Sequence, residues 1–231
     1  MKDLKRDLEK LRKIEKRKKH PLSHEIHKKY NITKKTLFYV KEYGSHSNVL
    51  KTILKESLKI VLFASILSSV GGFALEQIKS TFISITPLII LLPVLNSMVG
   101  NYGIIISSRF STLLYTGKLK GKWRKSSDLK HLIVQMSIIS IIMAVISASL
   151  SLAISYFSSY PISLLLSIKI FTIVILNVVF LVGILFLISI AAGLHYYEKG
   201  EDPDNFLIPI TTSIADFGSM LLLGIFILWM F

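Results

Sequence analysis

The stretch ISLLLSIKIFTIVILNVVFLVGILFLISIAAGL, residues 162–194, decides the fold class. Lys169 is its single charged residue, and Asn177 is its single amide side chain. A helix rises 1.5 Å per residue, so a stretch of this length exceeds the roughly 30 Å of hydrocarbon in a bilayer. It therefore predicts a transmembrane helix that is tilted or that protrudes from the membrane.

Four other stretches are apolar and long enough to cross a bilayer, at about residues 57–75, 82–107, 131–157 and 205–231. Only 18% of the 231 residues are charged, against about 25% in average globular chains. There is no cysteine, which excludes thiolate zinc sites, iron–sulfur clusters and a cysteine nucleophile. We expect an all-α integral membrane protein with five transmembrane helices, and the pattern excludes an ordinary soluble enzyme.

The distribution of charge predicts how the helices are oriented. Residues 1–56 hold 17 Lys+Arg and 7 Asp+Glu, and residues 109–130 hold seven basic residues with Asp128 as the only acid. Basic segments stay on the cytoplasmic side, so we expect the N-terminus to be cytoplasmic and the C-terminus outside. The first apolar run begins near Leu58, too late for a signal peptide. The chain then divides into a basic cytoplasmic arm, 1–56, and a five-helix membrane domain, 57–231, of a multi-pass protein in the plasma or inner membrane.

The basic arm begins with a predicted charged helix over residues 2–19. A narrow apolar stripe runs along it at Leu4, Leu8, Leu11 and Ile14. The helix can lie on anionic lipid headgroups, where each Lys or Arg contributes about 1 kcal/mol, or it can form a coiled coil between subunits. No nucleic-acid recognition motif is present, so no nucleic-acid partner is expected.

Three histidines of the arm, His20, His24 and His27, fall at positions i, i+4 and i+7. Imidazoles at this spacing can hold a transition metal. Pro21 disturbs a helix there unless it occupies the first turn. Random spacing in an arm rich in histidine and lysine is the favoured interpretation.

Asp216 is the charged residue placed deepest in the predicted membrane. It lies about ten residues into the last apolar stretch, which corresponds to roughly 15 Å of helix. Its face also carries Thr212, Ser213 and Ser219, which form a polar stripe, together with Met220. A carboxylate facing lipid is prohibitively costly, so Asp216 is expected to face a partner, a water-filled cavity or a cation, with Thr212 as a further oxygen ligand.

The second apolar stretch offers a matching polar position. Pro87 and Pro93 each remove a backbone donor, and Gly100 and Gly103 flank Asn101. We expect an interrupted helix whose carbonyls line a cavity, with Asn101 at a depth similar to that of Asp216. Ligands of this kind are hard oxygens, which favour Mg²⁺ or Ca²⁺, and a ligand set with few charges suits Mg²⁺. The alternative is that both side chains only satisfy hydrogen bonds inside the protein.

Other polar residues in the membrane have a packing interpretation beside a functional one. Small residues recur along the third stretch, at Ser140, Ala144, Ser147, Ser151 and Ser155, and in the first at Ser68 and Gly72, a pattern that lets helices approach closely. Asn177 either bonds another helix or lines a pathway. Glu76 either attracts cations at the outer mouth or ends a helix in water. Asp202 and Asp204 either form an inner vestibule or, with Pro203, begin a helix.

Two segments resemble one known family. Residues 93–112, PVLNSMVGNYGIIISSRFST, resemble the Pro…Gly-Asn…Ser-Arg-x-Ser-Thr signature of the MgtE-type magnesium transporters, closest to their eukaryotic solute-carrier branch. Residues 202–216, DPDNFLIPITTSIAD, resemble the second signature, in which a Pro-Asp-Asn run leads into a span that ends in an acid. The resemblance covers about residues 57–231.

The resemblance implies a transporter of divalent cations, chiefly Mg²⁺, with a pore at a two-fold axis between two five-span units. It assigns the central ion-binding role to Asp216 and a supporting role to Gly100 and Asn101. A single unit implies a parallel homodimer, with Mg²⁺ as the transported substrate and no resident cofactor. The basic arm differs from the acidic regulatory part of the bacterial branch, so the magnesium-sensing gate of that branch is expected to be absent.

Two rival functions belong to other classes. A membrane-anchored structural or regulatory protein would act through its basic arm and use the five helices as an anchor. An intramembrane enzyme would need a His/Glu metal motif or a serine paired with a histidine base, and neither is found in the predicted spans. The sequence therefore predicts a non-enzymatic transporter.

Overall fold

The computed structural model describes residues 2–13, 21–32, 36–37, 40, 49–119, 126–199 and 202–231. This part of the chain is helical and contains no strand. Its helices are α1 (Lys2–Lys13), α2 (Pro21–Tyr30), α4 (Val49–Glu76), α5 (Lys79–Ser84), α6 (Thr86–Tyr115), α7 (Ser127–Phe157), α8 (Leu164–Lys199) and α9 (Pro203–Met230). Five of them, α4 and α6 to α9, contain segments apolar and long enough to cross a membrane. The predicted all-α class and the five membrane helices are confirmed.

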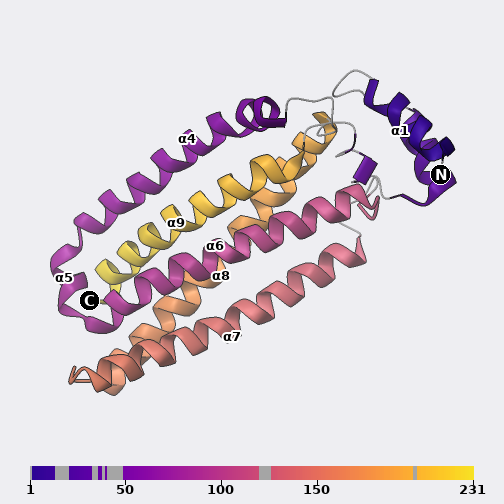
Figure 1. Cartoon of the computed structure of the whole chain (residues 1–231). Coiled ribbons are helices and arrows are strands. Elements are labelled where there is room, and N and C mark those ends of the chain that lie inside the picture. The colour runs from indigo at the N-terminus through magenta and orange to yellow at the C-terminus, as the bar shows by residue number, and fades with distance from the viewer. Residues whose placement is uncertain are drawn as a thin grey trace.

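Helix α9 lies at the centre of the bundle (Figure 1). It packs against α4 on one side and against α6 and α8 on the other, and α7 packs on the far side of α6 and α8. The core between these helices consists of fully buried aliphatic side chains, among them Leu95, Val99, Ile173, Leu181 and Leu223. Helix α4 exposes most of its apolar side chains, as expected of a helix that faces lipid.

The prediction that the second span is interrupted is wrong, because helix α6 is continuous. It runs without a break from Thr86 to Tyr115, although Pro93 lies inside it. Pro87 occupies the first turn, where a backbone N–H has no helical partner to lose. Pro93 removes only its own bond to the carbonyl of Ile89, and the apolar packing on both sides holds the helix together. The break in the chain falls earlier, at Ile85, between α5 and α6.

The small residues of α7 face the interior, as predicted. The side chains of Ser140, Ala144, Ser147, Ser151 and Ser155 are all buried. In α4, the sequence predicts that Gly72 lets a neighbouring helix approach, but Gly72 is exposed. Gly71 is the buried glycine, and a Cβ built on it would lie 3.0 Å from Phe217 Cα of α9.

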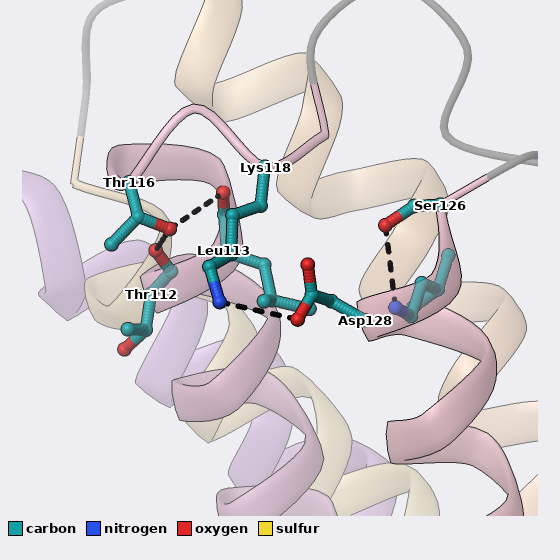
Figure 2. Close-up of polar contacts among 7 residues, drawn as sticks. Thr112, Leu113, Thr116, Lys118, Ser126 and Asp128 are labelled. Carbon is teal, nitrogen blue, oxygen red and sulfur yellow. Dashed lines mark hydrogen bonds and ion pairs between the residues drawn. The ribbon is translucent and has the colours of Figure 1, made fainter.

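Residues at the two ends of the connection between α6 and α7 form an ion pair and hydrogen bonds (Figure 2). Lys118 pairs with Asp128 at 3.1 Å, and the Ser126 hydroxyl accepts a hydrogen bond from the Leu129 amide at the start of α7. Asp128, the only acid between residues 109 and 130, is therefore neutralised. Arg109 and Lys130 are exposed, and residues 109–130 keep a net positive charge.

The apolar stripe of α1 packs against apolar side chains of α2 and of the residues that follow α2. Leu11 of α1, Ile26 of α2 and Leu37 are buried together, with Leu4, Leu8, Leu22, Tyr30 and Ile32 packed around them. The Tyr30 hydroxyl donates to Asp7 at 3.1 Å, which ties α2 to α1. The stripe is thus occupied within the chain, which argues against its use in a coiled coil between subunits. Ile14 and the rest of the predicted helix, to residue 19, lie outside the described residues.

Candidate functional site

Helix α9 begins with strong local signals. The Asp202 carboxylate accepts a hydrogen bond from the Asp204 amide at 3.2 Å, and Pro203 occupies the first turn. Asp202 is 2% exposed, and acids in a first turn also interact favourably with the helix dipole. The ring of Phe206 stacks on Tyr196 of α8 with 3.9 Å between centroids. The geometry therefore gives Asp202 a capping role, and the vestibule role for Asp202 and Asp204 stays a prediction.

The next two turns of α9 carry three hydroxyls that bond to carbonyls of the preceding turn. Thr211 donates to Leu207 O at 2.8 Å, Thr212 to Ile208 O at 2.9 Å, and Ser213 to Pro209 O at 2.8 Å. Each hydroxyl proton is thereby used, while the oxygen keeps lone pairs with which it can accept or coordinate. Thr212 is partly exposed, so its oxygen is accessible to a ligand.

Asp216 lies at the middle of α9, one turn beyond Thr212. It is thirteen residues from Pro203 and fourteen from Met230, so about 20 Å of helix separate it from each end. The side chain is partly buried. Its carboxylate forms no ion pair or hydrogen bond with any residue that the structure describes. A carboxylate at this depth without a protein partner is costly, and the cost falls when a cation binds it.

The contact between α6 and α9 fixes the height of Asn101 relative to Asp216. A Cβ on Gly103 would lie 3.1 Å from the Thr211 Cβ, so the two helices touch there. Asn101 is two residues from this contact and Asp216 is five, which corresponds to about 3 Å and about 7.5 Å along the antiparallel helices. Each side chain also points well away from the contact, by about 160° and about 140° around its own helix. The two residues therefore lie at a similar depth but do not meet between α6 and α9.

The face of α6 that no neighbouring helix covers carries polar side chains among apolar ones, since Ile89, Val94, Ile104 and Ile105 are also exposed. Ser97, Asn101 and Thr112 are exposed on it, and Ser108 is partly exposed. Gly100 is buried, yet a Cβ built on it would meet no heavy atom within 4 Å, so the space beside it is open to a larger group. The exposed Asn101 amide is the costly group next to lipid, because a hydroxyl such as that of Thr112 bonds to a carbonyl of its own helix. This face needs water or another protein surface beside it.

Three buried hydroxyls meet in a junction one turn beyond Gly103 on α6. This junction was not predicted from the sequence. Ser107 of α6 lies 3.1 Å from the Thr211 hydroxyl and 3.4 Å from that of Ser189 in α8. All three side chains are fully buried. The available signal was the spacing of Gly103 and Ser107, which places two small residues on one face of α6. The partners on α8 and α9 follow only from tertiary packing.

The other predicted site residues have partners of their own. Asn177 is fully buried between α8 and α9, and its amide donates to Ser219 O at 3.1 Å. Glu76 is exposed at the end of α4 and pairs with Lys79 at 3.3 Å, an exposed pair worth at most about 1 kcal/mol. Lys169 donates to Met230 O and lies 4.4 Å from the Phe231 ring centroid. It thus binds the end of α9.

The histidines of the arm do not form a metal cluster in the described part of the chain, where no group of three or more His, Cys, Asp or Glu converges. His27 Nδ1 lies 2.6 Å from the Ile32 carbonyl, which makes it a donor. His20 lies outside the described residues. Pro21 occupies the first turn of α2, the position in which a helix tolerates it.

These features define a multi-pass membrane protein that holds a carboxylate and a polar helix face near half depth. The model of a family described as "Divalent cation transporter", MgtE, matches residues 92–226. The match covers more than half of the chain and includes both α6 and α9, and the chain belongs to this family.

Two curated relatives carry the same printed name, Solute carrier family 41 member 2. The protein from Homo sapiens is 27% identical over 197 residues, and the one from Gallus gallus is 27% identical over 207 residues. Each match covers 78% of this chain and 33% of the relative. The chain thus spans about a third of the length of these relatives. No solved structure matches it.

Proposed function

We propose that the protein transports divalent cations, with Mg²⁺ as the substrate and Asp216 as the residue that binds it. The carboxylate without a protein partner at the middle of α9 is the observation that carries this proposal. Membership in a family described as divalent cation transporters supports it. A hydrated Mg²⁺ needs few charged ligands because it retains much of its water. Thr212, one turn before Asp216 on α9, adds an oxygen ligand, and Asn101 and the carbonyls near Gly100 contribute oxygens only where a second copy of the chain brings α6 to the ion.

The working unit in this proposal is a parallel homodimer. The polar face of α6, with Ser97 and Asn101, and the partly exposed Asp216 cannot remain against lipid at low cost. A second copy of the chain would cover this surface and enclose a polar path at the two-fold axis. Two Asp216 carboxylates facing each other repel unless a cation lies between them, which favours a divalent ion. The positive charge at one end of the bundle supports parallel subunits.

The basic arm is proposed to lie on anionic headgroups of the inner leaflet. Lys5, Arg6, Lys10 and Lys28 are exposed around its small apolar core, and each contributes about 1 kcal/mol near an anionic surface. Deletion of residues 1–50 distinguishes this supporting role from a protein that acts through its arm. If the protein is a transporter, the deletion variant retains ion flux. If the helices only anchor the arm, neither the full chain nor the deletion variant conducts ions.

The test is Mg²⁺ entry into proteoliposomes that contain a trapped indicator dye. Wild type is expected to conduct, and Asp216→Asn is expected to lose flux by about tenfold or more, since each 1.4 kcal/mol of lost binding is a factor of ten. Asp128→Asn removes the same charge at the exposed end of the bundle and is expected to retain flux. Light scattering of the purified protein measures the oligomeric state. Flux that survives in Asp216→Asn contradicts the ion site, and an active monomer contradicts the dimer pore.

A further inference from the structure

A pair of buried polar atoms lies between α8 and α9, apart from the proposed ion site. Asn177 and Ser219 are both 0% exposed. The Asn177 amide nitrogen donates to the backbone carbonyl of Ser219 at 3.1 Å, and this acceptor fixes which way the amide is turned. Asn177 Oδ1 and Ser219 Oγ have no hydrogen-bond partner in the part of the chain that the structure describes. Each is therefore a buried polar atom that needs a partner.

Ser219 differs from most hydroxyls in the membrane helices of this protein. Buried Ser155 donates to Ser151 O at 2.8 Å, and buried Thr211 donates to Leu207 O at 2.8 Å. Both satisfy themselves on their own helix, as serine and threonine commonly do. Ser219 forms no such bond to the preceding turn. Its hydroxyl therefore still needs an acceptor, which can come from outside α9.

A third polar atom without a partner comes from α6 at the same level. Asn96 lies seven residues before Gly103 and shares its face, so it projects toward α9 about 10.5 Å from the Gly103–Thr211 contact. The same step along the antiparallel α9 leads from Thr211 to Gly218, beside Ser219. Asn96 Oδ1 is buried and unpartnered among the described residues. A Cβ on Gly218 would meet Leu181 of α8 at 2.4 Å, so α8 and α9 are in close contact at this level.

We propose that Asn96, Asn177 and Ser219 bind one buried water molecule where α6, α8 and α9 meet. The donors and acceptors match: a water donates one proton to each amide oxygen and accepts the hydroxyl proton of Ser219. Buried waters typically form about three hydrogen bonds to polar groups that would otherwise lack partners. The set is uncharged, so a cation there would carry an uncompensated charge in a medium of low dielectric constant. Water is therefore the occupant that this site selects.

The proposed water joins three helices beside the turn that carries the ion-binding candidate. Ser219 is three residues after Asp216, and its backbone carbonyl is already held by Asn177. A bound water adds α6 to this connection and fixes the rotation of α9 at mid-membrane. The water site itself does not depend on the proposed transport, because its test measures the unfolding temperature rather than ion flux.

The test is a double-mutant cycle on the full chain in detergent, with Asn96→Leu, Asn177→Leu and the pair. Leucine keeps the branched shape of asparagine, is the larger side chain and has no polar atom, so each single variant removes one partner of the water. Each single variant is expected to lower the unfolding temperature by about 3 to 6 °C. The pair is expected to lose little more than the larger single loss, because the second change finds the bridge already broken. Asn96→Leu combined with Ser219→Ala gives a second cycle that does not require Asn177→Leu to fold.

Controls separate this result from general destabilisation and from a bound ion. Gln135→Leu changes an exposed amide of α7, and its effect is expected to add to that of Asn177→Leu. Additive losses in both water-site cycles would overturn the proposal. Unfolding is also measured in NaCl and in choline chloride at equal ionic strength. Equal temperatures are expected, and a stabilisation by Na⁺ that Asn177→Leu abolishes would show a cation site instead of water.

Discussion

Helices α7 and α9 both carry several polar side chains through the membrane, and they differ in where those side chains find partners. In α7, Ser151 donates to Pro87 O at 2.7 Å, Ser147 to Met98 Sδ at 3.7 Å, and Ser155 to the carbonyl of Ser151. In α9, the Asp216 carboxylate and the Ser219 hydroxyl find no partner among the described residues. The serines of α7 are therefore structural, whereas the middle of α9 requires partners from outside the five-helix unit or from bound water.

The comparison shows that the number of polar groups in a membrane helix does not identify a functional segment. Hydrogen bonds that close within the chain satisfy serine hydroxyls at little cost. An acid at half depth is costly unless it is paired or hydrated. Helix α9 also approaches its neighbours through glycines, at Gly71 of α4 and Gly103 of α6, where α7 uses serines. This close approach brings the backbone of α9 next to both helices near Asp216.

The largest effect on stability is expected at the contact of α4 with α9. A methyl group at Gly71 would lie 3.0 Å from both Phe217 Cα and Met220 Sδ, and the backbone atom cannot move aside alone. Gly71→Ala is expected to lower the free energy of unfolding by about 1 to 3 kcal/mol, as overpacking does. The measurement is unfolding in detergent, followed by the loss of tertiary fluorescence from the tryptophans.

Gly72→Ala is the matched control for this contact. Gly72 is adjacent in sequence, exposed, and has open space within 4 Å of a built Cβ. Its free energy of unfolding is expected to change by no more than about 0.5 kcal/mol. Equal losses in the two variants would contradict the close approach of α4 to α9 as the cause, because alanine has a higher helix propensity than glycine and cannot destabilise α4 through propensity.

The sequence predicted the elements better than their contacts. Long apolar runs with few charges identify all five membrane helices, because the bilayer imposes a length that composition alone can reveal. The small-residue face of α7 also followed from its sequence, since the residues repeat at helical spacing. Both predictions concern one helix and the membrane around it, so they require no knowledge of how the helices pack together.

Predictions that needed two helices at once were less complete. Gly71 and Gly72 differ by about 100° around α4, and only the position of α9 decides which one packs. The predicted break at Pro93 does not occur, because packing against neighbouring helices keeps α6 continuous, and the sequence of α6 alone does not show this packing. The junction of Ser107, Thr211 and Ser189 joins residues from three helices, and no periodicity within one helix indicates it.

Asp202→Ala tests whether the start of α9 serves the fold or the ion. Loss of its bond to the Asp204 amide is expected to lower the free energy of unfolding by about 1 kcal/mol. Flux per folded protein is expected to remain unchanged, because the capping carboxylate is 2% exposed. Glu198→Ala removes the same charge from an exposed residue at the end of α8 and should leave stability intact. A drop in flux in both variants at low salt, erased by added salt, would instead support a vestibule.

The smallest effect is expected from Ser151→Ala, and it tests the basis of the comparison. The variant loses the bond from Ser151 to Pro87 O, and such bonds between membrane helices average about 0.6 kcal/mol. Ser149→Ala is the control, since Ser149 is exposed and bonds only to Val145 O of its own helix. Both variants are expected to retain full flux in proteoliposomes. If Ser151→Ala reduced flux while unfolding changed this little, hydrogen-bonded serines of α7 would belong to the transport path, and bonding within the chain would no longer separate structural from functional polar residues.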